Sequence, residues 1–118
     1  MDFSVSNKGY FRGPHRDRDS RIVNFLIYLN SLSKNDGGVL SFYNIKKIKN
    51  YRFPRFPKTS SLKISKKFKA TRGDGIFFLS SPDSYHAVSK FIGKKIKQRY
   101  FVYGSFSLNK PVVWKKIS

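Results

Sequence analysis

The chain has 118 residues, 39% of them hydrophobic, which is enough for one domain with a packed core and too few for two. It has no cysteine, no apolar run near the roughly 20 residues of a membrane span and no signal-peptide h-region, so disulfides and thiolate-bound zinc are excluded and the cytoplasm is the default location. Twenty-five Lys and Arg against six acids, all Asp, give a net charge of +19, which favours an anionic partner or else only keeps the protein in solution.

The first expected elements are two strands joined by a turn. Residues 21–30, RIVNFLIYLN, are β-branched, aromatic and almost continuously apolar, which is typical of a buried strand. NDGG at 35–38 is a turn signal, and GVLSFY at 38–43 is expected to form a second strand that pairs back on the first.

A strongly basic segment follows at about 45–69. It carries eight lysines and two arginines without one acid, and aromatic residues alternate with Pro54 and Pro57 in its first half. Proline disfavours regular structure. We therefore expect a long loop inserted between two strands, and loops of this length are often functional.

Further short strands are expected in the last third of the chain. RGDG at 72–75 is a tight turn before the apolar run 76–81, and residues 85–91 alternate in polarity. GKK at 93–95 is expected to close a hairpin onto a last long strand at 99–108. Short strands separated by turns predict a sandwich or barrel of the all-β class, with little helix.

The two histidines of the chain suggest a metal site. If His15 and Asp17 lie on one strand, both face the same way and can bind one ion from one side. His86 is the only other histidine. Two imidazoles and one carboxylate match the facial triad of non-haem Fe(II) oxygenases, and zinc with three protein ligands is the competing interpretation.

A simpler interpretation treats HRDRDSR as an exposed charged turn. Asp19 then pairs with an arginine, Asp17 has no metal to bind, and His86 is a core histidine. The flanking sequence favours the metal site over this alternative, because four segments occur in the order of a known family: GPHRDRDSRIVNFLIYLN, DGGVLSFY, RGDGIFFLSSPDSYHAVSKF and KQRYFVYGSF.

These segments, over roughly residues 9–107, resemble the 2-oxoglutarate/Fe(II)-dependent dioxygenase superfamily, in particular its prolyl-4-hydroxylase-like branch. The resemblance implies a double-stranded β-helix, a jelly-roll barrel with the iron at one open end. It implies one such domain over 1–118. It also implies that the iron ligands, which are the catalytic residues, are His15, Asp17 and His86.

The resemblance further implies a pocket for the co-substrate 2-oxoglutarate. Arg99 matches the basic residue that anchors its distal carboxylate, a task that suits a planar guanidinium. Tyr28 matches a tyrosine that donates to the same carboxylate, and Leu40 matches an apolar position of the pocket. Tyr28 as plain core, Arg99 as one more surface cation and Lys97 as the true anchor are the alternatives.

Two departures from the family pattern stand out. The stretch from His86 to Arg99 is long, so FIGKKIKQ is expected to form an extended hairpin. Only fourteen residues precede His15, where relatives carry supporting elements and another pocket tyrosine, and Val5 or Tyr10 occupies that neighbourhood. The barrel is therefore expected to be minimal or truncated at its N-terminus, with one sheet face poorly covered.

The resemblance implies Fe(II), 2-oxoglutarate and O2 as requirements, with ascorbate as an auxiliary reductant. The expected activity is hydroxylation of a prolyl or other protein side chain, or of a small molecule, with release of succinate and CO2. Oxidative demethylation of nucleic acid is an alternative that suits the charge, although the second arginine that marks those enzymes is missing after Arg99. A non-catalytic basic barrel that binds an anionic partner is the third. The sequence sets no oligomeric state.

Overall fold

The computed structural model of the chain describes residues 1–46 and 54–111. Within these ranges it has eight strands and one turn of 3-10 helix. Their bounds are β1 Asp2–Ser6, β2 Arg12–His15, β3 Arg21–Tyr28, β4 Leu40–Ile45, η1 Thr59–Ser61, β5 Leu62–Phe68, β6 Gly75–Leu79, β7 Tyr85–Val88 and β8 Arg99–Ser107.

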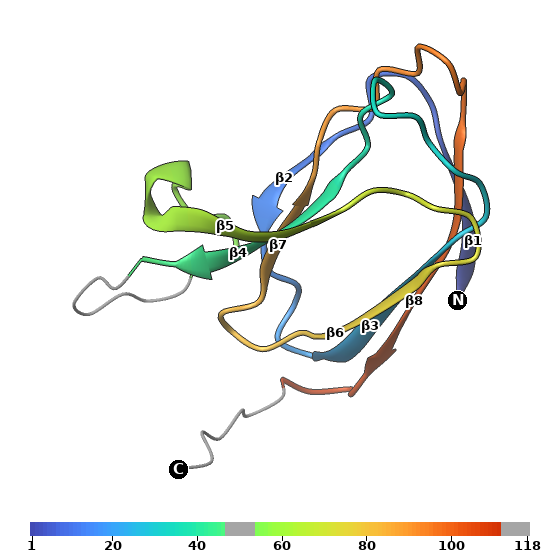
Figure 1. Cartoon of the computed structure of the whole chain (residues 1–118). Helices are drawn as coiled ribbons and strands as arrows, with labels where there is room; N and C mark the ends of the chain where they lie inside the picture. The colour runs from blue at the N-terminus through green and yellow to red at the C-terminus, as the bar shows by residue number, and fades with distance from the viewer. Residues whose placement is uncertain (47–53, 112–118) are drawn as a thin grey trace.

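The strands form two four-stranded antiparallel sheets that face each other (Figure 1), in the orders β1-β8-β3-β6 and β2-β7-β4-β5. From β2 onward each strand lies in the other sheet from the strand before it, except where β4 is followed by β5. This alternation is the double-stranded β-helix arrangement, and the prediction of an all-β jelly roll is therefore confirmed. No helix in the described part of the chain is long and apolar enough to cross a membrane.

Two of the predicted hairpins are wrong. β4 does not pair back on β3 but lies in the opposite sheet between β7 and β5, and β8 pairs with β1 and β3 rather than with β7. The chain does turn at the predicted NDGG segment, where Gly37 and Gly38 both have positive φ. However, a turn sequence does not reveal whether the next strand stays in its sheet or crosses to the other one.

The predicted loop over 45–69 is also wrong in its second half. β5 pairs in antiparallel register with β4 from Leu62 opposite Ile45 to Phe68 opposite Leu40. It is an edge strand with exposed residues between its two ends, so no apolar alternation marks it in the sequence. Lysines on an edge strand are a common protection against edge-to-edge aggregation. Residues 47–53 of the predicted loop lie outside the described residues.

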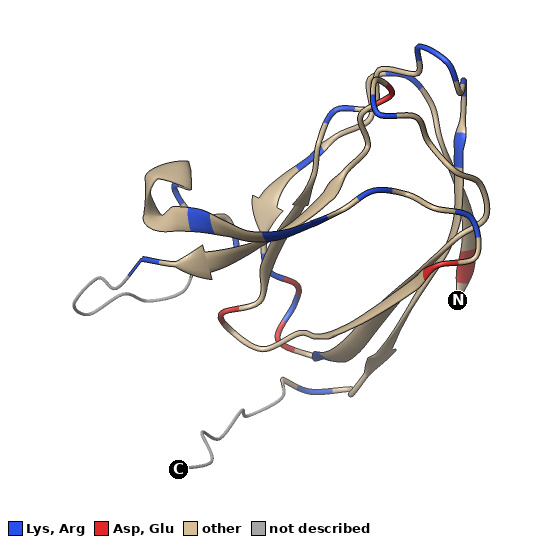
Figure 2. Cartoon of the chain, viewed as in Figure 1, with Lys and Arg blue, Asp and Glu red and all other residues tan. Residues whose placement is uncertain are grey.

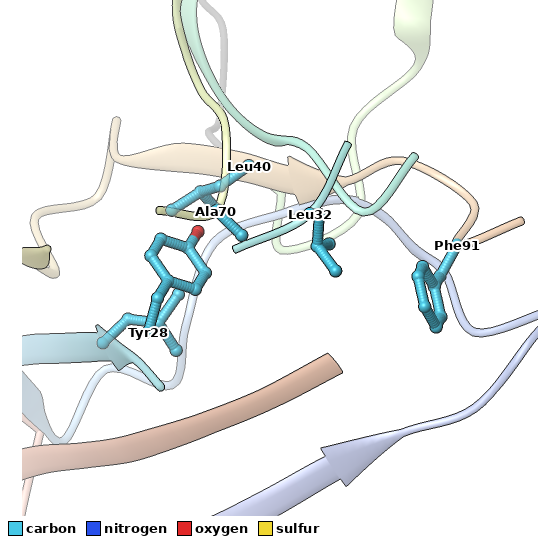
Figure 3. Packing of buried hydrophobic residues seen from close by; sticks show 6 residues of the cluster. Tyr28, Leu32, Leu40, Ala70 and Phe91 are labelled. Carbon is cyan, nitrogen blue, oxygen red and sulfur yellow. The ribbon is translucent and has the colours of Figure 1, made fainter. Parts of the chain in front are cut away.

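Side chains from both sheets point into the space between them. On β3 the buried residues are Asn24, Leu26 and Tyr28, so this strand alternates and is not buried on both faces as the sequence suggested. Leu26 and Tyr28 join a core cluster at one end of the barrel (Figure 3), together with Leu32, Leu40, Ala70 and Phe91.

The long connection between β7 and β8 folds around Asp36. The buried carboxylate of Asp36 accepts hydrogen bonds from the backbone N–H groups of Lys95 and Ile96, and its carbonyl accepts one from Ile92 N–H at 2.6 Å. Burial raises the pKa of Asp36, but hydrogen bonds from the backbone of Ser33, Lys95 and Ile96 outweigh it and lower this pKa to about 2. The connection therefore reaches β8 as an anchored loop that places Arg99 at the first position of the strand.

The outer face of the β1-β8-β3-β6 sheet carries a row of aromatic rings. Phe25 packs on Phe77 and Phe106, whose ring centroids lie 5.7 and 6.3 Å from its own, and Phe77 and Phe106 are 67% and 65% exposed. Phe3 on β1 is also exposed. The described residues leave this face uncovered.

Candidate active site

The three predicted metal ligands meet at one point between the sheets. His15 is the last residue of β2 and lies directly opposite His86 of β7 in the strand register. Their ring centroids are 4.3 Å apart. Asp17 follows β2, and its carboxylate oxygens lie 3.8 Å from Nε2 of each histidine. One ligand atom from each of the three residues can therefore face a common centre, with all of these atoms within 4.8 Å of one another.

The other ring nitrogen of each histidine faces a backbone carbonyl. Nδ1 of His15 lies 2.8 Å from the Gly13 oxygen, and Nδ1 of His86 lies 3.4 Å from the Ser84 oxygen. Such contacts place the proton on Nδ1 and leave the Nε2 lone pair free for a metal. Burial lowers the pKa of His15. For His86, burial and then the charge of His15 lower the pKa to about 4. Both imidazoles are therefore neutral at pH 7, the form that binds metal.

Asp17 reaches the centre in a different way from the one that the sequence suggested. β2 ends at His15, so Asp17 is not on a strand and the same-face spacing does not apply. Instead, the Nδ2 group of the buried Asn24 donates a hydrogen bond to Asp17 Oδ2 and another, at 2.6 Å, to Ser80 Oγ. Arg21 lies 3.9 Å from Asp17 Oδ1. Asp19, the other carboxylate considered, is 59% exposed and pairs with Arg16 at 2.6 Å.

The triad opens into a cavity of about 560 Å³ between the two sheets. Its lining includes His15, Asp17 and His86 at one place and Leu40 and Arg99 at another. Val5 and Tyr10 line it as well, in the neighbourhood where the family pattern has a further pocket tyrosine.

Arg99 is a cation without a counter-ion inside this cavity. Its side chain is only 1% exposed, and its guanidinium carbon lies 4.3 Å from the ring centre of Phe101 and 5.5 Å from that of Tyr28. Nε has no hydrogen-bond partner among the described residues. All six aspartates of the chain are described, and those in ion pairs, Asp17 and Asp19, have other partners.

The remaining predicted residues of the pocket differ in their placement. Leu40 lines the cavity. Tyr28 is buried in the core beside Arg99 and does not line the cavity, but its hydroxyl has no hydrogen-bond partner among the described residues. Burial raises the pKa of Tyr28, and the charge of Arg99 opposes part of that rise. Lys97, the alternative anchor, precedes β8, is exposed, and donates to the carbonyl oxygens of Gly93 and Lys94.

Sequence reasoning missed the residues that support the triad. Arg21 donates to the hydroxyl of Tyr103 and lies 3.4 Å from Asn24 Oδ1, so these three residues form a polar network beside Asp17. Asn24 was detectable, because it is a polar residue at the inward position of an otherwise apolar strand. Tyr103 was not, since it becomes a neighbour of Arg21 only through the pairing of β8 with β3.

The three side chains of the triad are suitable ligands for Fe(II), and the unpaired guanidinium of Arg99 is suited to bind a carboxylate of a dicarboxylic acid. Two neutral imidazoles and one carboxylate are the ligand types of a facial triad, although zinc accepts the same donors. The unpaired Nε of Arg99 and the unpaired hydroxyl of Tyr28 are buried donors that lack an acceptor. A carboxylate of a molecule bound in the cavity can accept hydrogen bonds from Arg99, which lines it, and unsatisfied buried donors of this kind are rare without such a role.

Comparison with known proteins agrees with this geometry. The sequence model of the 2OG-Fe(II) oxygenase superfamily matches residues 1–106. A comparison with curated proteins finds no match. Among solved structures, the fold is similar to a prolyl-4-hydroxylase from Pseudomonas putida, with a TM-score of 0.61 and 22% identity over 91% of this chain and 50% of that one. The chain thus spans about half the length of that hydroxylase. Because the family model covers nearly all of the sequence, the chain belongs to the 2OG-Fe(II) oxygenase superfamily.

Proposed function

We propose that this protein is an Fe(II)- and 2-oxoglutarate-dependent dioxygenase that hydroxylates a substrate. The observation that carries the proposal is the presence, in one cavity, of three convergent metal-ligand side chains and a buried arginine without a counter-ion. A binding relic has no physical need to keep all three ligands within 4.8 Å of one another. The same argument disfavours the third hypothesis, in which the protein is a non-catalytic basic barrel that binds an anionic partner.

In this proposal His15, Asp17 and His86 would hold Fe(II), each through one ligand atom. Bound iron with 2-oxoglutarate supplies the oxidative chemistry that consumes O2 and releases succinate and CO2. Arg99 anchors the distal carboxylate of 2-oxoglutarate through its guanidinium, and the Tyr28 hydroxyl donates to the same carboxylate. Leu40 and Phe101 exclude water around this pair, which strengthens both interactions. O2 as oxidant and ascorbate as auxiliary reductant stay predictions from the sequence.

The polar network around Asp17 has a positioning task. Asn24 and Arg21 hold the carboxylate next to both histidines, so the loop after β2 does not have to reorganise when metal binds. Preorganised ligands of this kind commonly raise metal affinity by about 10- to 100-fold.

We propose a prolyl or other protein side chain as the first substrate class, with a free small molecule as the next. The support is the similarity in fold to the Pseudomonas putida prolyl-4-hydroxylase. The test is succinate formation with Fe(II) and 2-oxoglutarate against prolyl peptides, methylated oligonucleotides and free amino acids. We expect one class to raise the rate above the substrate-free level and His86→Ala to abolish it. Succinate formation that never exceeds that of a chelator-treated sample contradicts the proposal.

Oxidative demethylation of nucleic acid is the second candidate, and the lysines of β5 favour it. Lys63, Lys66 and Lys67 are exposed on this edge strand, and Figure 2 shows the basic stretch along β5. Replacing these three residues with Gln should weaken binding of a single-stranded oligonucleotide and flatten its salt dependence. An unchanged salt slope removes the support for this candidate. A cytoplasmic location stays a prediction from the sequence.

A further inference from the structure

Arginine is the positively charged residue that lines the cavity in the described part of the chain, although the sequence contains more lysine than arginine. The sequence contains eight arginines and seventeen lysines. Five of the eight arginines line the cavity, whereas no lysine of the described residues does so. A protein that only needed positive charge for solubility would show no such preference at one site. The five are Arg12, Arg18, Arg21, Arg55 and Arg99.

Two of these arginines have a task in the proposed reaction. Arg99 is the buried anchor for the co-substrate, and Arg21 binds Tyr103 and lies beside Asp17. The other three, Arg12, Arg18 and Arg55, are here called the mouth arginines. They are exposed, and none of them forms an ion pair with a carboxylate of the described residues.

Iron and co-substrate do not account for the mouth arginines. The charges of Fe(II), the Asp17 carboxylate, dianionic 2-oxoglutarate and the Arg99 guanidinium cancel one another. Arg21 also lines the cavity, so no negative charge is left there to neutralise the mouth arginines. Asp17 is the only carboxylate that lines the cavity within the described ranges, and it is the predicted metal ligand. Like charges held at one opening repel one another, so their presence indicates an anionic ligand.

The mouth arginines are held close to the triad by the backbone. Arg12 opens β2 and Arg18 directly follows Asp17, so both are tied to the segment that carries two of the ligands. Arg55 comes from the segment before η1. Its carbonyl accepts a hydrogen bond from Arg16 N–H at 2.9 Å, and the neighbouring Pro54 carbonyl accepts one from the Tyr85 hydroxyl at 2.6 Å.

The side chain of Arg55 also contacts the ring of the next residue in the chain. Its guanidinium carbon lies 5.3 Å from the ring centre of Phe56, a distance at which cation and ring attract each other. A guanidinium binds an oxyanion through its planar fork. The same fork accepts either a carboxylate or a phosphate group.

We propose that the substrate of this protein carries an acidic group, a carboxylate or a phosphate, that the mouth arginines bind while the neighbouring carbon faces the triad. The proposal rests on the proposed function for the reaction. The binding of the acidic group stands on the cavity alone. It makes Arg12, Arg18 and Arg55 the residues that determine specificity for an anionic substrate.

Two triple variants with the same loss of charge test this proposal. The mouth variant replaces Arg12, Arg18 and Arg55 with Gln. The strand variant replaces Lys63, Lys66 and Lys67 of β5 with Gln and serves as the matched control, since none of these lysines lines the cavity. All six positions are exposed, so both variants are expected to fold, which circular dichroism and thermal unfolding check.

The probes are three peptides, acetyl-Gly-Xaa-Pro-Gly-amide, in which Xaa is Gln, Glu or phosphoserine. Their binding is measured by calorimetry, without O2, to protein loaded with Fe(II) and saturating 2-oxoglutarate, so that Arg99 is occupied. The same titrations are repeated with metal-free protein. We expect the wild type and the strand variant to bind the Glu or the phosphoserine peptide at least about tenfold more tightly than the Gln peptide, and the mouth variant to lose this preference.

The outcomes test the binding of an acidic group separately from the proposed reaction. A preference for Glu identifies a carboxylate and a preference for phosphoserine identifies a phosphate, and either supports the proposal. Equal binding of the three peptides, no binding of any, a preference that survives in the mouth variant, or an equal loss in both variants overturns it. If the preference is present but succinate is never formed, the binding site stands and the proposed reaction fails.

Discussion

Arg99 is a buried cation without a counter-ion, which destabilises the folded chain. Its replacement should therefore raise the stability of the free protein while it abolishes the binding of 2-oxoglutarate. In Arg99→Met an unbranched apolar side chain takes the place between Phe101 and Tyr28. We expect the free protein to become more stable, because the variant removes a buried charge that has no counter-ion and a donor that has no acceptor. We expect the binding of 2-oxoglutarate to be lost, because the distal carboxylate then has no cation.

The magnitudes follow from the two states of Arg99. A buried polar group without a partner costs about 1–3 kcal/mol, so the free variant should gain about that much stability. For a chain of this size the gain corresponds to an increase in Tm of roughly 3–5 °C per kcal/mol. Two charge-assisted hydrogen bonds to a carboxylate contribute about 3–6 kcal/mol, so the affinity for 2-oxoglutarate should fall roughly 10²- to 10⁴-fold.

Thermal unfolding with and without 2-oxoglutarate measures both effects in one assay. The wild type should gain Tm as 2-oxoglutarate is added, whereas Arg99→Met should start higher and gain nothing. Lys97→Met is the control, because Lys97 is exposed and bonds only to carbonyls of its own loop. A variant that is less stable in the free state, or that is still stabilised by 2-oxoglutarate like the wild type, refutes this account of Arg99.

Three further predictions concern the support of the site. Asn24→Ala should weaken metal binding about 10- to 100-fold in a metal titration, since it removes the hydrogen bond that holds Asp17; unchanged affinity denies Asn24 this role. The free energy of unfolding of metal-free protein, measured in urea, should level off above about pH 7.5 and fall toward pH 4, because unfolded His86 binds protons in this range and folded His86 does not. His86 contributes at most about 1.4 kcal/mol per pH unit, and His15, whose pKa is also lowered, adds to the slope. His86→Gln should flatten this slope, and an unaltered slope contradicts the assignment. Gly37→Ala should lower Tm far more than Gly9→Ala: both have positive φ, but only at Gly37 does a Cβ meet a backbone oxygen, at 2.0 Å.

The order of the motifs predicted which residues lie together better than it predicted how they are held. His15, Asp17 and His86 converge and Arg99 lines their cavity, while their roles stay predictions. The reason given for Asp17 was wrong, since a tripeptide spacing does not show where β2 ends. Its position depends on Asn24, seven residues further along the chain, and on a hydrogen bond that local sequence does not encode.

The fold was predictable as a class and less so in its pairing. The strands β3, β4, β6, β7 and β8 coincide with apolar runs, but which strand pairs with which is decided by contacts between distant segments. β5 escaped detection because its exposed lysines hide the strand pattern. The mouth arginines were likewise not predictable as a group, because Arg55 reaches Arg12 and Arg18 through tertiary contacts, namely those of its segment with the backbone of Arg16 and with the Tyr85 hydroxyl.

The central claim is that His15, Asp17 and His86 bind Fe(II) in the cavity where 2-oxoglutarate is anchored. Its most direct test is a visible absorption titration of metal-free protein with Fe(II) and 2-oxoglutarate in the absence of O2. We predict a charge-transfer band that requires both additions, saturates at one Fe(II) per chain and is absent in His86→Ala. A band that persists in His86→Ala, or a wild type that shows none, contradicts the claim.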